Sequence, residues 1–574
     1  MRIRPIILAL LSLLAPLAVA AGADTGEPVT VFVAKKIITM DATRPEATHV
    51  AVADGRILAV GGPRDMAPWI TDRPHVIDER FRSKYLMPGL IDPHLHPYIG
   101  ALLLPMDFVT PHAWTLPGQS VEGVRGHDAY VARLHSLEAE KQDETGWLMT
   151  WGYHHLYHGP ISRSDLDAIS STRPILVWHR SFHEVYMNSA ALEILELRAK
   201  NGDAAPHGVD YENGHFWELG MRLALSRLAP ILLAPAHYQR GLALTRQAIH
   251  AGGITSIMDG AFGTLDLETE WRALQAWETD DLPFRVVLLP DGRALGEELG
   301  HQRAMQVIEQ LPERSSEHLI FPTKSVKLFS DGAFYSQLMQ MGPPGYLDGH
   351  GGEWLMQPAE LLTAARVYWN AGYQINVHAN GDRGIDAALD VLERLQGERP
   401  RLDHRYALHH FGYSTPEQAE RLAALGGIVS ANPYYLWALG DLYAKHGLGP
   451  ERASQMVRLG ALHRSGVRFS LHSDFTMAPA SPLRLAQVAA SRRTAEGNVM
   501  APRERVPIPV ALRAITLDAA HLMKMEDEIG SIRAGKRADF TVLERNPIDT
   551  KADELGEIPI WGTVFGGRIF PARP

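Results

Sequence analysis

The chain has 574 residues, which is longer than a simple single domain usually is. Hydrophobic residues make up 45% and charged residues 21%, the balance of a globular protein with a large core. The net charge is −10 and the sequence has no long basic run, so nucleic acid is not an expected partner. Because there is no cysteine, disulfides and thiolate ligands are excluded, and any metal must be held by histidine, aspartate, glutamate or a modified lysine.

The N-terminal segment 1–23 has the three parts of a signal peptide. Arg2 and Arg4 precede an apolar run over residues 6–17, and two A-x-A cleavage sites follow at 18–20 and 21–23. The alternative is a membrane anchor, but the run is too short to span a bilayer comfortably. We therefore expect an exported protein, periplasmic or secreted, with no membrane segment after cleavage.

Strand patterns occupy both ends of the remaining chain. Near the N-terminus, two β-rich runs flank an Asp54-Gly55 turn, which is typical of a β-hairpin. Near the C-terminus, residues 527–543 read as strand, turn and strand, and residues 561–569 add another strand. These segments predict a small β domain.

Between the two ends, strands and helices alternate. Segment 98–250 has helical and mixed patterns, with a helix over 128–141 and a buried strand over 174–179. From residue 240 onward, amphipathic segments precede apolar runs, and this repeated alternation favours a parallel sheet closed into a (β/α)8 TIM barrel over an open sheet. The expected helices are 240–251, 265–277, 301–311, 358–371, 383–396, 415–425 and 451–465, and the expected strands are 255–259, 284–289, 325–329, 373–378, 406–410, 427–431 and 467–471.

Candidate metal ligands stand at or near the ends of these strands, where barrel enzymes build their sites. His94 and His96 follow an apolar run, and side chains two residues apart in a strand point to the same face. A bare His-x-His can also be two structural histidines at a strand end. Four further residues occur in order at later strands, and this succession favours a metal site. They are Lys327, His378, His410 and Asp474.

The stretch from Pro88 to His96, Pro-Gly-Leu-Ile-Asp-Pro-His-Leu-His, closely resembles the first metal motif of the amidohydrolase superfamily. The resemblance is strongest to the family 3 branch, which includes the N-substituted formamide deformylases, and it runs from about residue 30 to the C-terminus. It implies that the terminal strands, residues 24–86 and 521–574, join into one β-sandwich. A barrel over 87–520, with an insertion around 98–250, would lie beside it.

The resemblance also implies a binuclear metal centre, in which Lys327 would be the shared ligand. In related enzymes the equivalent lysine is carboxylated by CO2, and the carbamate bridges two divalent metals, here expected to be Zn²⁺. Residues 327–333, Lys-Leu-Phe-Ser-Asp-Gly-Ala, match the branch's motif. Carboxylation would turn a costly buried cation into an anionic donor. The alternative is a lysine that forms a salt bridge with Asp331 or lies on an exposed face.

Three other histidines allow more than one role. His409 and His410 are adjacent, so strand alternation predicts that only one faces the barrel interior, and the resemblance favours His410. His472 stands two residues before Asp474, where it is expected to contact substrate or add a ligand. His183 follows a buried strand and resembles a substrate-facing histidine of the family, although a structural loop role is equally compatible with its position.

These residues predict hydrolysis of an amide-type C–N bond in a small-molecule substrate. The metals would activate water, and Asp474 would carry the proton to the leaving nitrogen. Ester or lactone cleavage and deamination are alternatives within the hydrolases. A non-catalytic exported protein that binds a ligand or regulates another process is the alternative from a different class. Assembly into a homo-oligomer is left open.

Cleavage of the signal peptide should leave a mature protein that begins near residue 21 or 24. N-terminal sequencing of exported protein measures this directly. Recovery of exported chains that still begin with Met1 would contradict the predicted cleavage.

Overall fold

The computed structural model describes residues 28–572 except 142, 144–145, 200–204 and 280. The predicted signal peptide, residues 1–23, lies outside the described residues. Within the described part, no single helix is long and apolar enough to cross a membrane. Two helices, α7 (Leu219–Leu232) and α8 (Pro235–Ala251), are long and apolar enough for a membrane span only when they are taken together, and a 99° bend separates them.

Eight parallel strands form the centre of the molecule, and their hydrogen bonds place them in two sheets. The first sheet has the order β16-β15-β14-β5, and the second has the order β17-β18-β19-β20-β21. Continuous burial along β15 is typical of parallel strands that are covered on both faces. The strands are β5 (Leu90–Leu95), β14 (Ile254–Phe262), β15 (Arg285–Pro290), β17 (Ser325–Phe329), β18 (Gln374–Ala379), β19 (Ala407–His410), β20 (Ile428–Ala431) and β21 (Phe469–Leu471), with the short β16 (Leu319–Ile320) beside β15.

The two sheets meet at two seams. A parallel β-bridge between Asp291 and Lys327 joins the end of β15 to β17. At the other seam, the Asp474 amide donates a hydrogen bond of 3.0 Å to the His94 carbonyl, which ties the end of β21 to β5. The eight strands therefore follow the sequence order of a TIM barrel, as the alternating pattern predicted.

Helices surround these strands and are amphipathic as expected. On α13, for example, Ile385, Leu389 and Leu392 recur on one face and are buried. The helix predicted over 451–465 is interrupted, because Val457 has a left-handed φ of 50° and donates its amide hydrogen to the Gly412 carbonyl. The helices are α9 (Leu267–Leu274), α10 (Gly292–Leu299), α11 (His301–Gln310), α12 (Pro358–Asn370), α13 (Asp382–Glu398), α14 (Pro416–Ala424), α15 (Tyr434–His446), α16 (Pro450–Ser454), α17 (Leu459–Arg464), α18 (Pro482–Ser491), α19 (Ile508–Ala514) and α20 (Leu517–Leu522).

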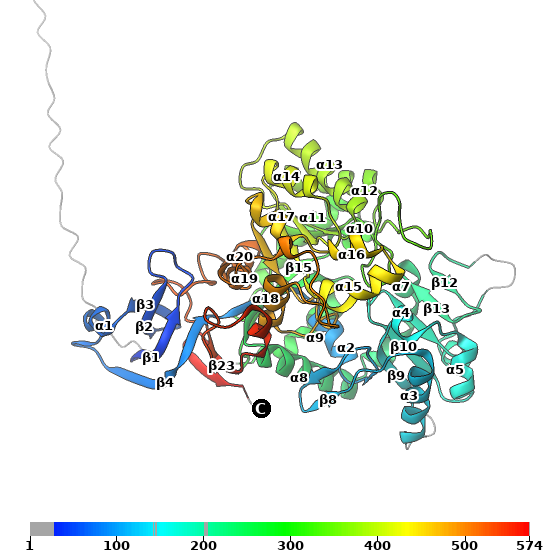
Figure 1. Cartoon of the computed structure of the whole chain (residues 1–574), viewed down its shortest axis with the longest axis horizontal. Coiled ribbons are helices and arrows are strands. Elements are labelled where there is room, and N and C mark those ends of the chain that lie inside the picture. The colour runs from blue at the N-terminus through cyan, green and yellow to red at the C-terminus, as the bar shows by residue number, and fades with distance from the viewer. Residues whose placement is uncertain (1–27, 142, 144–145, 200–204, 280, 573–574) are drawn as a thin grey trace, which may run out of the picture.

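The chain between β5 and β14 adds a mixed sheet on one side of the barrel, drawn in cyan in Figure 1. Its strand order is β12-β13-β11-β10-β9-β6. The predicted helix over 128–141 and strand over 174–179 are both present, as α3 and β10. The strands are β6 (Asp107–Phe108), β9 (Leu148–Tyr153), β10 (Ile175–His179), β11 (Glu184–Met187), β12 (Val209–Asp210) and β13 (His215–Trp217), and the helices are α2 (Pro97–Leu103), α3 (His127–Glu140), α4 (His155–His158), α5 (Arg163–Ile169), α6 (Ser189–Ile194), α7 and α8.

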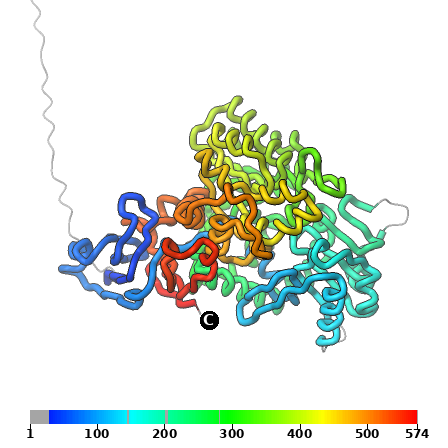
Figure 2. Tube along the Cα trace, viewed as in Figure 1, coloured from blue at the N-terminus to red at the C-terminus, as the bar shows by residue number. Residues whose placement is uncertain are grey.

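The two ends of the described chain share one mixed sheet, with the order β24-β23-β22-β4-β1-β2-β3. Figure 2 shows these first and last segments, in blue and red, side by side. Phe32, Phe81 and Phe540 pack in its core, which is consistent with the predicted β-sandwich. The elements are β1 (Val29–Ile38), β2 (Glu46–Ala53), β3 (Arg56–Gly61), α1 (Pro63–Ile70), β4 (His75–Pro88), β22 (Phe540–Leu543), β23 (Ile560–Phe565) and β24 (Arg568–Pro571).

A buried ion pair fastens the terminal sheet to the barrel. Arg285 begins β15 and Asp539 immediately precedes β22, and their side chains are only 1% and 3% exposed. The Arg285 Nη2 lies 2.7 Å from the Asp539 Oδ2, and the guanidinium also stacks on the Phe565 ring. Loss of one partner would leave the other charge buried and unpaired.

Replacement of Arg285 by alanine should therefore lower the free energy of unfolding by about 3–5 kcal/mol. The matched control is Arg366→Ala, which removes a pair with Glu398 in which both side chains are about one-third exposed and should cost less than about 1 kcal/mol. Urea unfolding of the three proteins measures the difference. Equal stability losses would contradict an anchoring role for Arg285.

Candidate metal centre

The end of β5 brings two histidines to one carboxylate. Leu95 is buried in packing, whereas His94 and His96 turn to the opposite face, with ring centres 5.1 Å apart. The Asp474 Oδ1 lies 3.5 Å from the His94 Nε2 and 3.2 Å from the His96 Nε2. Gly260 is required opposite them, because a Cβ there would lie 2.5 Å from the His94 Nε2. These three side chains form a group that can hold a metal ion.

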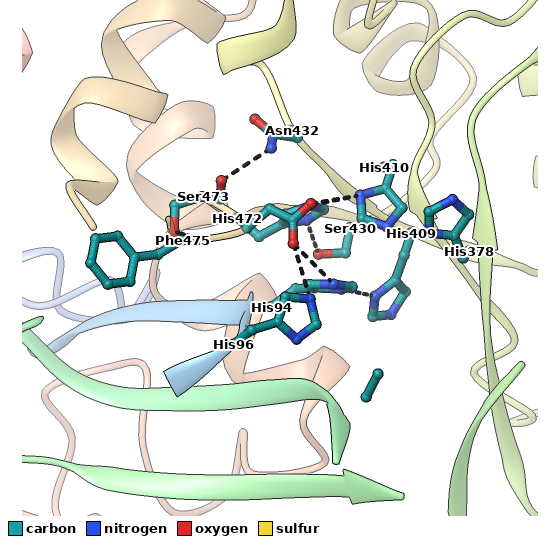
Figure 3. A network of polar contacts seen from close by, with 12 residues as sticks. His94, His96, His378, His409, His410, Ser430, Asn432, His472, Ser473 and Phe475 are labelled. Carbon is teal, nitrogen blue, oxygen red and sulfur yellow. Dashed lines mark hydrogen bonds and ion pairs between the residues drawn. The ribbon is translucent and has the colours of Figure 1, made fainter. Parts of the chain in front are cut away.

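The position of Asp474 is set by its neighbours in the chain. Asp474 adopts a left-handed φ of 56° after β21, and the preceding Ser473 is held by Asp92. The Ser473 amide donates a hydrogen bond of 3.1 Å to the Asp92 Oδ1, and its hydroxyl donates to the Oδ2 of the same carboxylate. Asn432 donates to the Ser473 carbonyl, as Figure 3 shows. Asp92 was not singled out in the sequence, yet it fixes the turn that presents Asp474.

The protonation states of His96 and Asp474 favour the binding of a cation. Burial raises the pKa of Asp474, but the hydrogen bond from His96 and nearby positive charges outweigh it, so its pKa lies below the usual value. Burial lowers the pKa of His96, yet its bonds to Asp259 and Asp474 raise it to about 9. The carboxylate is thus ionised at neutral pH, and a divalent ion can take the place of the His96 proton.

Lys327 lies in the middle of β17 and is only 1% exposed. Its Nζ has no hydrogen-bond partner among the described residues. The alternative salt bridge with Asp331 does not form, because that carboxylate instead accepts backbone hydrogen bonds from Asn380, Gly381 and Gln340. Burial lowers the pKa of Lys327 to about 7, with opposing contributions from Asp474 and Asp291.

His378 and His410 lie side by side across from His94 and His96, with their ring centres 4.4 Å apart (Figure 3). The His378 Nε2 is 2.9 Å from the side-chain amide of Asn380. The His410 Nε2 is buried and has no hydrogen-bond partner in the described parts of the chain, whereas its Nδ1 lies 3.7 Å from the Asp474 Oδ2. The structure therefore brings His410 to the same carboxylate as the first pair, with His378 beside it.

The prediction that only one of His409 and His410 faces the barrel interior is wrong. His409 pairs through its Nδ1 with the His94 Nδ1 and through its Nε2 with the Asn376 Oδ1, so it lies inside the barrel behind His94. His410 also faces the centre, because its φ of 75° breaks the alternation of an extended strand. His410 lines the cavity described below, whereas His409 does not.

His472 and His183 occupy different places. His472 is fully buried, stacks on His94 with ring centres 4.7 Å apart, and is not on the cavity wall. Its Nε2 lies 3.2 Å from the His410 Nδ1, and its place behind the cavity wall disfavours the predicted substrate contact. His183 does line the cavity, and its Nδ1 lies 2.7 Å from the Glu218 Oε2.

A cavity of about 160 Å³ opens above the centre, close to the roughly 150 Å³ that accepts a benzene-sized group. Glu218 lies on its wall, in a stretch that the family resemblance weakly assigns to the substrate region, whereas sequence reasoning missed Asp259 and Arg293 there. Asp259 could have been found, because it ends a predicted strand. Most other lining side chains are apolar, namely Tyr98, Ile99, Leu102, Trp178, Phe182, Leu219, Met221, Leu225, Leu265, Phe329, Leu355 and Met477.

A separate histidine group, His154, His155 and His179, lies in the insertion. The Nδ1 atoms of His154 and His179 accept backbone hydrogen bonds from Leu156 and Ser181. Burial lowers the pKa of both rings, so each is neutral and carries its proton on Nε2. A protonated Nε2 cannot bind a metal, and the barrel centre is therefore the better metal site.

The donors in the barrel fit divalent ions. They combine imidazoles with an ionised carboxylate, and imidazole suits zinc and related metals. The unpartnered Lys327 Nζ and His410 Nε2 point to the same conclusion, because buried polar atoms are normally satisfied.

Several known proteins resemble this chain over most of its length. The chain is 26% identical over 559 residues to an N-substituted formamide deformylase of Arthrobacter pascens, covering 92% of this chain and 96% of that protein. It is also 26% identical over 557 residues to the protein LONG AFTER FAR-RED 3 of Arabidopsis thaliana, covering 93% and 90%. Among solved structures, an uncharacterized metal-dependent hydrolase from Pyrococcus horikoshii shares the fold, with a TM-score of 0.68, 19% identity and coverage of 91% and 99%. The amidohydrolase family model matches residues 82–571, which include all six predicted ligands, and the chain therefore belongs to the amidohydrolase family.

Proposed function

We propose that this protein is an exported, metal-dependent hydrolase that cleaves an amide-type C–N bond. The observation that carries the proposal is the buried, unpartnered Lys327 beside a set of histidines and an ionised aspartate. The similarity to a formamide deformylase over nearly the whole chain supports an amide-type substrate. Export, to the periplasm or out of the cell, is supported only by the N-terminal sequence.

Two Zn²⁺ ions are the proposed cofactors. His94, His96 and Asp474 would hold one ion, His378 and His410 the other, and a carbamate on Lys327 would lie between them. Bound divalent ions would lower the pKa of water and polarise the substrate carbonyl. The lowered pKa of Lys327 supports the carbamate, because the neutral amine is the form that reacts with CO2.

The protein's own residues then transfer protons and position the substrate. Asp474 is ionised and lies at the cavity wall, so it can accept a proton from the attacking water and deliver it to the leaving nitrogen. Burial lowers the pKa of His183, but Glu218 outweighs this and raises it, so the imidazole can donate a hydrogen bond to substrate. The apolar wall would exclude bulk water from the reacting bond.

Removal of the Lys327 side chain, as in Lys327→Ala, should reduce bound metal from about two ions per chain toward one, because the bridging donor is lost. Metal analysis by mass spectrometry measures this on freshly purified protein. Bicarbonate should assist reconstitution of the wild-type apoprotein but not of the variant.

The matched control is Lys324→Ala, an exposed lysine three residues earlier, which should keep the wild-type metal content. Unchanged metal content in Lys327→Ala would make Lys327 a structural lysine.

An Asp474→Asn variant should lower turnover by roughly 10²–10⁴, the range of general acid–base catalysis. Asparagine keeps the size and one oxygen but cannot accept the proton at neutral pH. Metal content and melting temperature should change far less than turnover. A screen over formamides, N-acyl amines, N-acyl amino acids and cyclic amides, in zinc-loaded protein, supplies the assay.

Asp390→Asn, on the exposed face of α13, is the control for loss of an aspartate. Near-normal turnover of the Asp474→Asn protein would remove Asp474 from the mechanism. A zinc-loaded wild type that hydrolyses none of these amides would contradict the proposed function.

A further inference from the structure

A second buried cation, Arg293, stands on the wall of the same cavity. It lies in the first turn of α10, just after β15, and is only 6% exposed. Its Nε and Nη1 atoms have no hydrogen-bond acceptor in the described part of the structure. A guanidinium buried with unused donors is costly unless an acceptor is supplied.

The nearby carboxylates are already engaged, and Glu218 pairs with the His183 ring and accepts a hydrogen bond from the Ala333 amide. Asp291 caps α10 and accepts hydrogen bonds from the Arg293 and Ala294 amides and from the Thr264 hydroxyl. The Glu297 Oε1 is 3.9 Å from the Arg293 Nε, but this half-exposed side chain also accepts a 2.7 Å hydrogen bond from Arg222. The cavity therefore contains a cation whose donor capacity the protein does not fill.

Arg293 and Lys327 of the metal centre both lie next to the Phe329 ring. Its Cζ lies 4.3 Å from the centre of the Phe329 ring, and the Lys327 Nζ lies 5.5 Å from the same ring centre. Apolar side chains, among them Trp178 and Leu265, form most of the remaining wall, which also carries Glu218, Glu270 and Arg222. A ligand in this cavity would meet the reacting centre, the Arg293 guanidinium and a largely apolar surface.

We propose that the substrate carries a carboxylate that pairs with Arg293, next to an apolar group. This inference rests on the proposed amide hydrolysis and names its substrate class, an N-acyl amino acid with an apolar side chain. A carboxylate matches the planar fork of the guanidinium and can accept two hydrogen bonds from it. The cavity volume of about 160 Å³ suits an aliphatic side chain of leucine size.

The experiment compares two substrates that differ only in the carboxylate. N-formyl-leucine carries it, and N-formyl-isoamylamine lacks it. Formate release by zinc-loaded wild type, Arg293→Gln and Arg293→Lys gives kcat/KM for each substrate. The Gln variant should lose about 10- to 100-fold on N-formyl-leucine, the effect of hydrogen bonds to a charged group, and less than about threefold on N-formyl-isoamylamine. The Lys variant should lose less, because it keeps the charge.

The control variant is Arg303→Gln, on the exposed face of α11, which should leave both values unchanged. Metal content and melting temperature are measured on every preparation. Calorimetry of N-formyl-leucine binding provides a readout that does not need turnover, and the Gln variant should bind about 10-fold more weakly.

Equal losses on both substrates, with a fall in metal content, would overturn the inference and assign Arg293 to support of the Lys327 carbamate. Unchanged binding and turnover of N-formyl-leucine in the Gln variant would also overturn it. A wild type that hydrolyses only the neutral formamide would overturn the substrate class and leave the proposed function intact. If the wild type hydrolyses neither but Arg293 is needed to bind N-formyl-leucine, the recognition stands and the hydrolysis fails.

Discussion

A buried lysine without a partner is the constraint on which the site depends. An unpaired ammonium in a barrel interior is costly, and burial, partly opposed by Asp474 and Asp291, lowers the pKa of Lys327 to about 7. Around it lie an ionised carboxylate, Asp474, and imidazoles with a free ring nitrogen, such as His410. A carbamate on the lysine and two divalent cations would satisfy these groups together, because each supplies what the others lack.

The barrel brings these groups together because its two sheets are joined at the ends of their strands. One seam of the barrel bridges Asp291 to Lys327, and the other binds the Asp474 amide to the His94 carbonyl. Lys327, His94 and Asp474 thus stand where the two sheets meet. His378 and His410 lie on β18 and β19, within the second sheet. The terminal sheet adjoins this region, since β4 runs through Pro88 toward the first metal motif and pairs there with β22. The insertion contributes a cavity wall, including His183 and Phe182.

Sequence patterns predicted the order of strands and helices and brought six ligand candidates to one region, because strand-end positions in a repeated strand–helix pattern converge by topology. Backbone details could not be predicted. The left-handed φ of His410 lets two adjacent histidines face inward, and the left-handed φ of Val457 divides a predicted helix. Arg293 was missed because a single arginine after a strand carries no signal until its burial and its unused donors are known. The domain boundaries stay predictions.

The proposed centre holds two metals that share a carboxylated Lys327. Anomalous diffraction at the zinc absorption edge, from crystals of protein loaded with zinc and bicarbonate, tests this directly. Two peaks about 3.5–4 Å apart are expected, the spacing of two-metal sites, with continuous density from the Lys327 Nζ to a carboxyl group between them. A single peak, or a Lys327 side chain that ends at Nζ beside two peaks, would contradict it.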